Sequence, residues 1–185
     1  MPSLPKTPLF SLTFLSLLTL TACEPVAEPQ PDPPPNPTKD VAPTPDVEAT
    51  GTIIEIAMTM REGDENGPLR QFSPRLVRAK VGDTIRFVPS SPEHEIASIE
   101  TMLPEGARGF ASEPGEAASY VVPEPGIYGI QCVPHYAAGS VGIIVVEGEG
   151  MTANLEAART ADHPGRANEE FFEVFAEAER RGWLE

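Results

Sequence analysis

The sequence predicts an all-β sandwich followed by two C-terminal α-helices. Between residues 51 and 150, short segments of alternating or β-branched residues recur between turn residues, without a helical period. After Gly150 the apolar residues recur at spacings of three and four, which is the period of a helix packed on one face. The preceding stretch, Pro25 to Ala49, is rich in proline, acidic and small residues and is not expected to form a core.

The first 22 residues are typical of an export signal. Lys6 is the only charged residue before an apolar run from Leu9 to Leu20, and this run is too short to cross a bilayer. The run ends in Leu-Thr-Ala-Cys at residues 20–23, which resembles the lipobox of bacterial lipoproteins. In that class cleavage leaves the cysteine as the lipidated N-terminus, so we expect Cys23 to carry a lipid anchor. The alternative is an ordinary secretory signal with a chance cysteine.

These features predict a periplasmic protein that is anchored to a membrane. The residue after Cys23 is Glu24, whereas an Asp at this position would favour retention in the inner membrane. We therefore expect the anchor to lie in the outer membrane, with the inner membrane as the alternative. Residues 23–50 are then a proline-rich tether, because a polyproline II segment extends by about 3.1 Å per residue. A disordered segment without a mechanical role is the alternative.

Five segments of the middle region are expected to be strands of a single domain, residues 51–150. The first, residues 52–58, is β-branched and is expected at or near a sheet edge. Residues 76–81 and 84–88 alternate on either side of a Gly-Asp turn, and residues 127–132 follow a Pro-Gly turn. Residues 141–146 form a continuous apolar run between two glycines, which indicates a central strand.

The last region, residues 151–185, is expected to contain two helices that pack on the sandwich. Residues 153–159 can form two helical turns, and Asn168 is expected to cap a longer helix that extends through Ala178. Phe172 is expected to widen the buried face of this helix. His163 lies between the helices beside Pro164 and Gly165, and we expect an exposed loop residue without a role in metal binding. The predicted buried stripe consists of Phe171, Val174, Phe175 and Ala178.

The formal net charge of −15 excludes a nucleic-acid-binding protein, which needs a basic stripe. We expect no enzymatic activity, because the sequence contains no catalytic triad pattern, phosphate loop or cluster of paired carboxylates. A cysteine nucleophile at Cys132 is the alternative, but no acid is placed to orient the nearby His135. With Cys23 lipidated, Cys132 has no disulfide partner, and a free thiol outside the cytoplasm survives when it is buried or bound to metal.

The strongest functional signal is Cys132-Val133-Pro134-His135 together with a distant His94. One thiolate and two imidazoles form the soft donor set that suits copper, because Cu(I) prefers sulfur, Cu(II) prefers imidazole, and a trigonal site accommodates both. Pro134 lacks an N–H and stiffens the turn between the two ligands. The sequence therefore predicts a copper site at His94, Cys132 and His135.

Two longer strings resemble the cupredoxins, and within them the pseudoazurins. Residues 94–107, which include Met-Leu-Pro-Glu-Gly-Ala, are similar to the segment around their first copper ligand, and residues 132–139 are similar to their second ligand loop. The step of 38 residues from His94 to Cys132 agrees with this resemblance. The resemblance implies a Greek-key β-sandwich with two C-terminal helices and one type 1 copper ion. It also implies electron exit at His135, through an apolar patch that includes Pro134, Tyr136, Ala137 and Ala138.

The chain departs from the family at the axial position. Pseudoazurins carry a methionine five residues after the second histidine, and this chain has Ser140 there; Ala138 also replaces a bulkier apolar residue. Met102 belongs to the matched string and is expected to be a packing residue. Met58 or Met60 could approach the site only if the first strand is shifted, and Met151 lies beyond the last strand. If oxygen completes the site, the potential falls and zinc is better tolerated; an empty axial space predicts a higher potential.

Three functions remain open at this point. The first is a lipid-anchored periplasmic electron carrier, expected as a monomer, that exchanges electrons with a redox partner such as a cytochrome or a copper reductase. The second is a copper-handling module without redox cycling, and the third is an interaction module that has lost its metal. Between residues 51 and 150 the chain has fourteen acidic residues but only Lys80 and six arginines as basic residues. This acidic balance favours a partner whose docking surface is basic or apolar.

Overall fold

The computed structural model describes residues 49–60 and 70–185. The predicted signal peptide, Cys23 and nearly all of the tether lie outside the described residues, and the division of the chain into four segments stays a prediction. None of the helices in the described part of the chain is long and apolar enough to cross a membrane.

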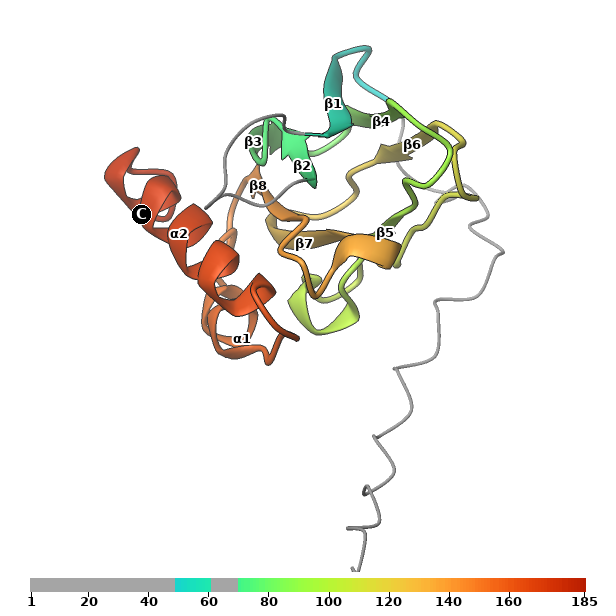
Figure 1. The fold of residues 1–185 in the computed structure, drawn as a ribbon. Helices are drawn as coiled ribbons and strands as arrows, with labels where there is room; N and C mark the ends of the chain where they lie inside the picture. Colours follow the sequence, from blue (N-terminus) through green and yellow to red (C-terminus); the bar gives the residue numbers. More distant parts are fainter. Residues whose placement is uncertain (1–48, 61–69) are drawn as a thin grey trace, which may run out of the picture. The chain divides into compact units, whose positions relative to one another are not determined.

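Within these residues, eight strands form two four-stranded sheets (Figure 1). The first sheet has the order β2-β1-β4-β6 and the second has the order β3-β8-β7-β5. The prediction of a sandwich is confirmed. The strands are β1 (Ile53–Met60), β2 (Arg70–Ser73), β3 (Leu76–Lys80), β4 (Thr84–Pro89), β5 (Ile96–Ser98), β6 (Ala118–Val121), β7 (Gly126–Cys132) and β8 (Val141–Glu147).

Both sheets mix parallel and antiparallel pairs. β1 runs parallel to β4 and antiparallel to the edge strand β2, so β1 lies one strand in from the edge, which agrees with its expected position at or near an edge. β8 runs parallel to β3 and antiparallel to β7. β8 is therefore an interior strand, as its apolar run predicts.

Alternation along β8 explains why its sequence is apolar at nearly every position. Ile144 and Val146 belong to the core between the two sheets, whereas Ile143 and Val145 belong to a second core on the other face of the strand. Successive side chains of a strand point to opposite faces, so a strand that is covered on both faces needs apolar residues throughout.

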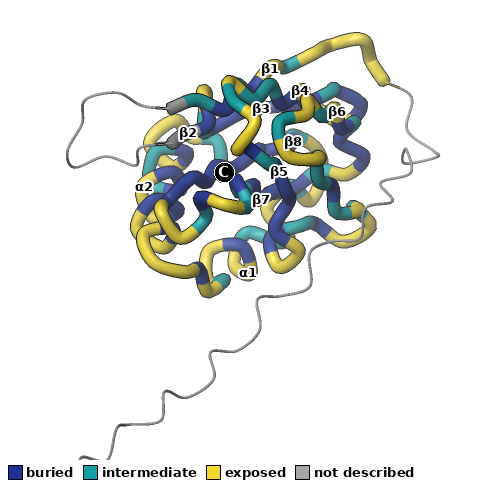
Figure 2. Tube along the Cα trace, turned by 45° about the vertical axis from the view of Figure 1, so that its right-hand side comes forward, coloured by how far each residue is buried: buried dark blue, intermediate teal, exposed yellow. Residues whose placement is uncertain are grey.

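The two C-terminal helices cover the outer face of the second sheet. α1 (Leu155–Thr160) contacts β7, and α2 (Ala167–Arg180) contacts β8 and β3. The predicted stripe is confirmed, because its four residues are buried in the second core, and burial alternates around α2 (Figure 2).

Two expectations for α2 were wrong. Phe172 is 74% exposed, because it lies one residue, or about 100° of helical rotation, beyond Phe171 and so leaves the buried face. Asn168 is not the cap: the helix begins at Ala167 after Arg166, and the Asn168 side chain hydrogen bonds back to the main chain of His163.

Candidate metal centre

His94 lies in the short connection between β4 and β5. Its main chain is held at both ends, because its N–H donates to the carbonyl of Ser91 at 3.3 Å and its carbonyl accepts from Gly115 at 2.7 Å. Gly115 has a φ of 76°, and a Cβ there would lie 2.9 Å from the Cα of Pro92. A glycine is therefore required where the two backbones approach beside His94.

Cys132 and His135 come from the end of β7 and the turn that follows it. Cys132 is the last residue of the strand, and residues Val133–His135 form a single 3₁₀ turn with a proline in it. The loop is closed by two main-chain bonds: Cys132 N–H donates to the Ser140 carbonyl at 3.0 Å, and Ser140 N–H donates to the His135 carbonyl at 3.1 Å. Two donors of the candidate site thus belong to one compact loop.

The sheet register brings the distant histidine to this loop. β5 pairs with β7 so that Ile96 faces Cys132, and beyond the strand ends the N–H of Val133 donates to the carbonyl of Glu95 at 2.8 Å. His94 precedes Glu95, so the pairing of β5 with β7 carries it to the turn that holds Cys132 and His135.

The three predicted ligands converge in the interior. Cys132 Sγ lies 3.6 Å from His94 Nδ1 and 3.2 Å from His135 Nδ1, and the three ligand atoms lie within 4.8 Å of one another. His94, Cys132 and His135 are all buried. A thiol can donate only one hydrogen bond, whereas two ring nitrogens lie next to this sulfur. A cation bound to a thiolate and two neutral imidazoles satisfies all three atoms at once.

The separations fit a single transition-metal ion. Bonds of about 2.3 Å to sulfur and about 2.0 Å to nitrogen, at angles near tetrahedral or trigonal, separate the sulfur from each nitrogen by roughly 3.5 to 3.7 Å. The observed 3.6 Å to His94 lies in this range, and the 3.2 Å to His135 is slightly shorter. The donor set, one thiolate and two imidazoles, is that of a blue-copper site.

Ser140 closes the ligand loop and is 2% exposed. Its main chain makes the two closing bonds to Cys132 and His135, so position 140 lies beside two of the three ligands. The residue that closes the ligand loop is therefore a serine.

Met102 lies on the opposite face of β7 from Cys132. A Cβ at Gly129 would lie 2.4 Å from the Met102 sulfur, and Met102 belongs to the helix-covered core, whereas Cys132 belongs to the core between the sheets. Met102 is therefore a packing residue, as expected. Met58 is buried in the core between the sheets, and the side chain of Met60 lies outside the described residues.

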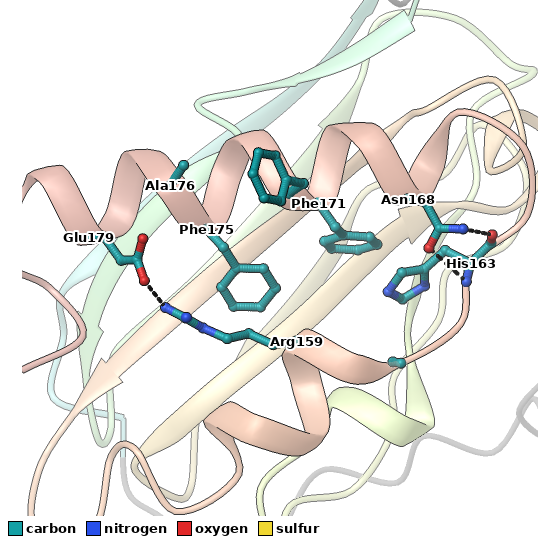
Figure 3. Close-up of a pocket in the computed structure, with 9 residues that line it drawn as sticks. Arg159, His163, Asn168, Phe171, Phe175, Ala176 and Glu179 are labelled. Carbon is teal, nitrogen blue, oxygen red and sulfur yellow. Dashed lines mark hydrogen bonds and ion pairs between the residues drawn. The ribbon is translucent and has the colours of Figure 1, made fainter.

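His163 is not the exposed loop residue that the sequence suggested. It is only 8% exposed, and its Nδ1 lies 2.6 Å from the hydroxyl oxygen of Tyr136, the residue that follows His135. Its ring also packs on Phe171, with 4.2 Å between the ring centroids. The Asn168 side chain bonds both the N–H and the carbonyl of His163 (Figure 3). Sequence analysis missed this contact because Tyr136 and His163 are 27 residues apart in the chain. The only hint was that an amide residue, Asn168, and an aromatic residue, Phe171, follow His163 closely in the sequence.

Burial keeps both partners of this hydrogen bond uncharged near neutral pH. It raises the pKa of Tyr136 to about 12. It also lowers the pKa of His163, against an opposing effect of the neighbouring Asp162 carboxylate. The phenol is the stronger donor and the neutral imidazole the stronger acceptor, which favours donation from the Tyr136 O–H to His163 Nδ1.

Comparisons with known proteins agree with this geometry. Residues 58–147 match the family model described as copper binding proteins of the plastocyanin/azurin family. Pseudoazurin of Paracoccus pantotrophus is 44% identical over 98 residues, which cover 53% of this chain and 66% of that protein. Pseudoazurin of Methylorubrum extorquens is 34% identical over 123 residues, which cover 66% of this chain and 81% of that protein.

This chain belongs to the pseudoazurin family. The solved structure of a pseudoazurin from Sinorhizobium meliloti superposes with a TM-score of 0.61 at 32% identity, and the match covers 69% of this chain and 97% of that one. The pseudoazurin fold, a sandwich of two sheets with two C-terminal helices, is the fold described above. Pseudoazurins are copper proteins rather than enzymes, which agrees with the expected absence of enzymatic activity.

Proposed function

We propose that this pseudoazurin carries single electrons through one type 1 copper ion, which is bound by His94, Cys132 and His135. The observation that supports this most strongly is the convergence of three buried donor atoms within 4.8 Å, from two segments that are 38 residues apart. A copper ion bound there supplies a one-electron Cu(II)/Cu(I) couple. The chain contributes the donors, and the buried site excludes water from the thiolate.

His135 is the proposed point of electron exchange. It is 8% exposed and lies on the loop that also carries Pro134, Tyr136, Ala137 and Ala138, the apolar patch of the family resemblance. A redox protein that docks on this patch reaches a copper ligand directly. The acidic balance of the chain favours a partner with a basic or apolar face, such as a cytochrome or a copper reductase.

Ser140 is the proposed axial residue in place of methionine. A hydroxyl or a water at that position is a harder donor than a thioether, so it stabilises Cu(II) relative to Cu(I) and lowers the potential. The same change makes zinc a better substitute for copper, because zinc accepts oxygen donors readily.

We also propose that the protein acts in the periplasm as a lipid-anchored monomer. The lipobox-like sequence at Cys23 and the proline-rich stretch behind it support this, and pseudoazurin relatives make a periplasmic site the natural one. Tethering raises the concentration of the carrier near a membrane-bound partner without any new contact. Labelling of the expressed protein with a radioactive fatty acid, compared between wild type and Cys23→Ala, tests the anchor. Label that persists in Cys23→Ala would contradict it.

The decisive test of copper binding is metal analysis combined with a visible absorption spectrum. Protein supplied with copper is expected to hold one copper per chain and to show a thiolate-to-copper charge-transfer band that disappears on reduction. Cys132→Ser, which keeps a small polar side chain, is the matched control and should lose the band. A copper-loaded wild type that shows no such band in either oxidation state would refute the proposal.

A copper-handling module without redox cycling is the second candidate, and Ser140 is the observation that favours it. A weaker axial donor makes the site more open to exchange of the ion with another protein. Reversible cycling of the absorption band by a chemical oxidant and reductant, without loss of metal, favours the carrier. Release of the ion on each reduction favours the copper-handling module.

A further inference from the structure

The connection between α1 and α2 lies against the loop that supplies two of the copper ligands. We call residues 161–166 the junction and residues 133–140 the ligand loop. The N–H of Arg166 donates to the carbonyl of Ala137 at 2.9 Å. A Cβ at Gly165 would lie 2.5 Å from the same carbonyl oxygen, and Gly165 has a φ of 54°. The two backbones therefore meet without room for a side chain between them.

The first turns of α2 hold the far end of the same loop. Glu170 pairs with Arg75 at 2.8 Å and with Arg166 at 3.6 Å, and its side chain is only 12% exposed. A Cβ at Gly139 would lie 2.8 Å from the Cγ of Glu170, so the carboxylate stem packs directly on the residue before Ser140. Because the Glu170 carboxylate is nearly buried, leaving it unpaired would be costly, so the two arginines help to fix its position.

The side chain of His163 in the junction bonds to a side chain of the ligand loop. Its own position is over-determined: Asn168 bonds its N–H at 3.2 Å and its carbonyl at 2.7 Å, and Phe171 stacks on its ring (Figure 3). From this fixed position Nδ1 is hydrogen bonded to the Tyr136 hydroxyl, with 2.6 Å between the two atoms. Tyr136 is adjacent to His135 in the chain, so a restraint on Tyr136 limits how His135 can move.

We infer that His163 is a positioning residue for the copper site, acting through Tyr136 on the ligand loop that carries His135. This inference rests on the proposed function. With serine at position 140, the end of the ligand loop has no thioether to bind the ion and to fix the loop from inside. The junction and the start of α2 restrain the loop from outside instead, through His163 on Tyr136, Arg166 on Ala137 and Glu170 on Gly139.

The test compares three variants that change the Tyr136–His163 bond. His163→Leu removes the ring nitrogen, Tyr136→Phe removes the hydroxyl, and His163→Asn keeps a polar atom near the position of Nδ1. We expect His163→Leu and Tyr136→Phe each to release Cu(I) to a chelator about tenfold faster, the effect of losing one buried hydrogen bond. Both should also change the Cu(II) paramagnetic resonance spectrum, which a loss of global stability alone would not do.

The double variant and two controls make the result specific. His163→Leu combined with Tyr136→Phe should release copper no faster than either single variant, because both remove the same bond. His163→Asn should recover part of the wild-type rate. Phe172→Ala changes a 74% exposed ring on the same helix and should behave as wild type. Single-variant rates within about twofold of wild type, or effects that add in the double variant, would overturn the inference.

The metal-free protein separates this inference from the proposed function. If wild type binds no copper, the proposed function fails on its own. The positioning role is then measured as the nitrogen-15 relaxation of the Tyr136 to Ser140 amides in metal-free wild type and His163→Leu. Faster internal motion of these amides in the variant is the expected result. Equal motion in a variant whose thermal unfolding shows that it is folded would overturn the inference.

Discussion

The N–H of Val133 donates to the carbonyl of Glu95 at 2.8 Å, and this bond joins the two segments that carry the copper ligands. Glu95 follows His94, and Val133 follows Cys132. A main-chain bond between neighbours of two ligands fixes their separation without using a side chain. The geometry of the metal centre thus depends on continuing the β5–β7 ladder one step beyond the strands.

Val133→Pro should weaken both the fold and the metal site, because proline has no N–H to donate to Glu95. Losing this hydrogen bond to a half-buried residue is expected to lower the free energy of unfolding by about 1 kcal/mol. Cys132 has φ −89° and ψ 113°, an extended conformation that a following proline tolerates, so the backbone itself accepts the change. Val133→Ala keeps the N–H and is the control. Denaturant unfolding with copper titration measures both effects, and equal behaviour of the two variants would show that the bond is not needed.

Ser140→Met should restore a thioether to the axial position. We expect a more intense visible charge-transfer band and a higher reduction potential, because a soft donor stabilises Cu(I). Ser140→Leu adds similar bulk without sulfur and separates ligation from exclusion of water. Spectra and potentials that are the same in Ser140→Met and wild type would mean that position 140 does not face the metal.

Gly129→Ala should destabilise the protein without changing its copper spectrum. The new Cβ would lie 2.4 Å from the sulfur and 2.8 Å from the Cβ of Met102, so the change overpacks the helix-covered core. Overpacking of this kind costs about 1 to 3 kcal/mol. The double variant Gly129→Ala with Met102→Ala should be less destabilised than the sum of the two single changes. Additive losses, measured by denaturant unfolding, would show that the two side chains do not compete for space.

The stability of the protein should fall as the pH is lowered through the titration of His163. Burial lowers the pKa of His163 in the native state, so the unfolded chain, with an ordinary pKa near 6.5, binds the proton first. The contribution is complete above about pH 7 and is lost between the unfolded and the native pKa. His163→Leu should lack this part of the pH dependence. Unfolding curves of wild type and variant from pH 5 to pH 8 test this, and parallel pH profiles would contradict it.

The sequence alone predicted much of the fold because its periods are local properties. The run at residues 141–146 and the stripe along α2 follow from repeats of two and of three to four residues, and both are buried as expected. Phe172 and Asn168 were misjudged because one step along a helix changes the face, and because a side chain suited to a cap bonded to the preceding loop instead.

The sequence alone identified the donor set of this protein. Cys132 and His135 lie on one short turn, and His94 lies in the other segment that resembles the cupredoxins, 38 residues before Cys132. Only the tertiary structure decided how the ligand loop is supported. The bond from Tyr136 to His163 and the packing of Glu170 on Gly139 join residues about thirty positions apart. Such contacts form when α2 packs on the second sheet. They depend on where two independently formed elements meet, and no local period of the chain encodes that meeting point.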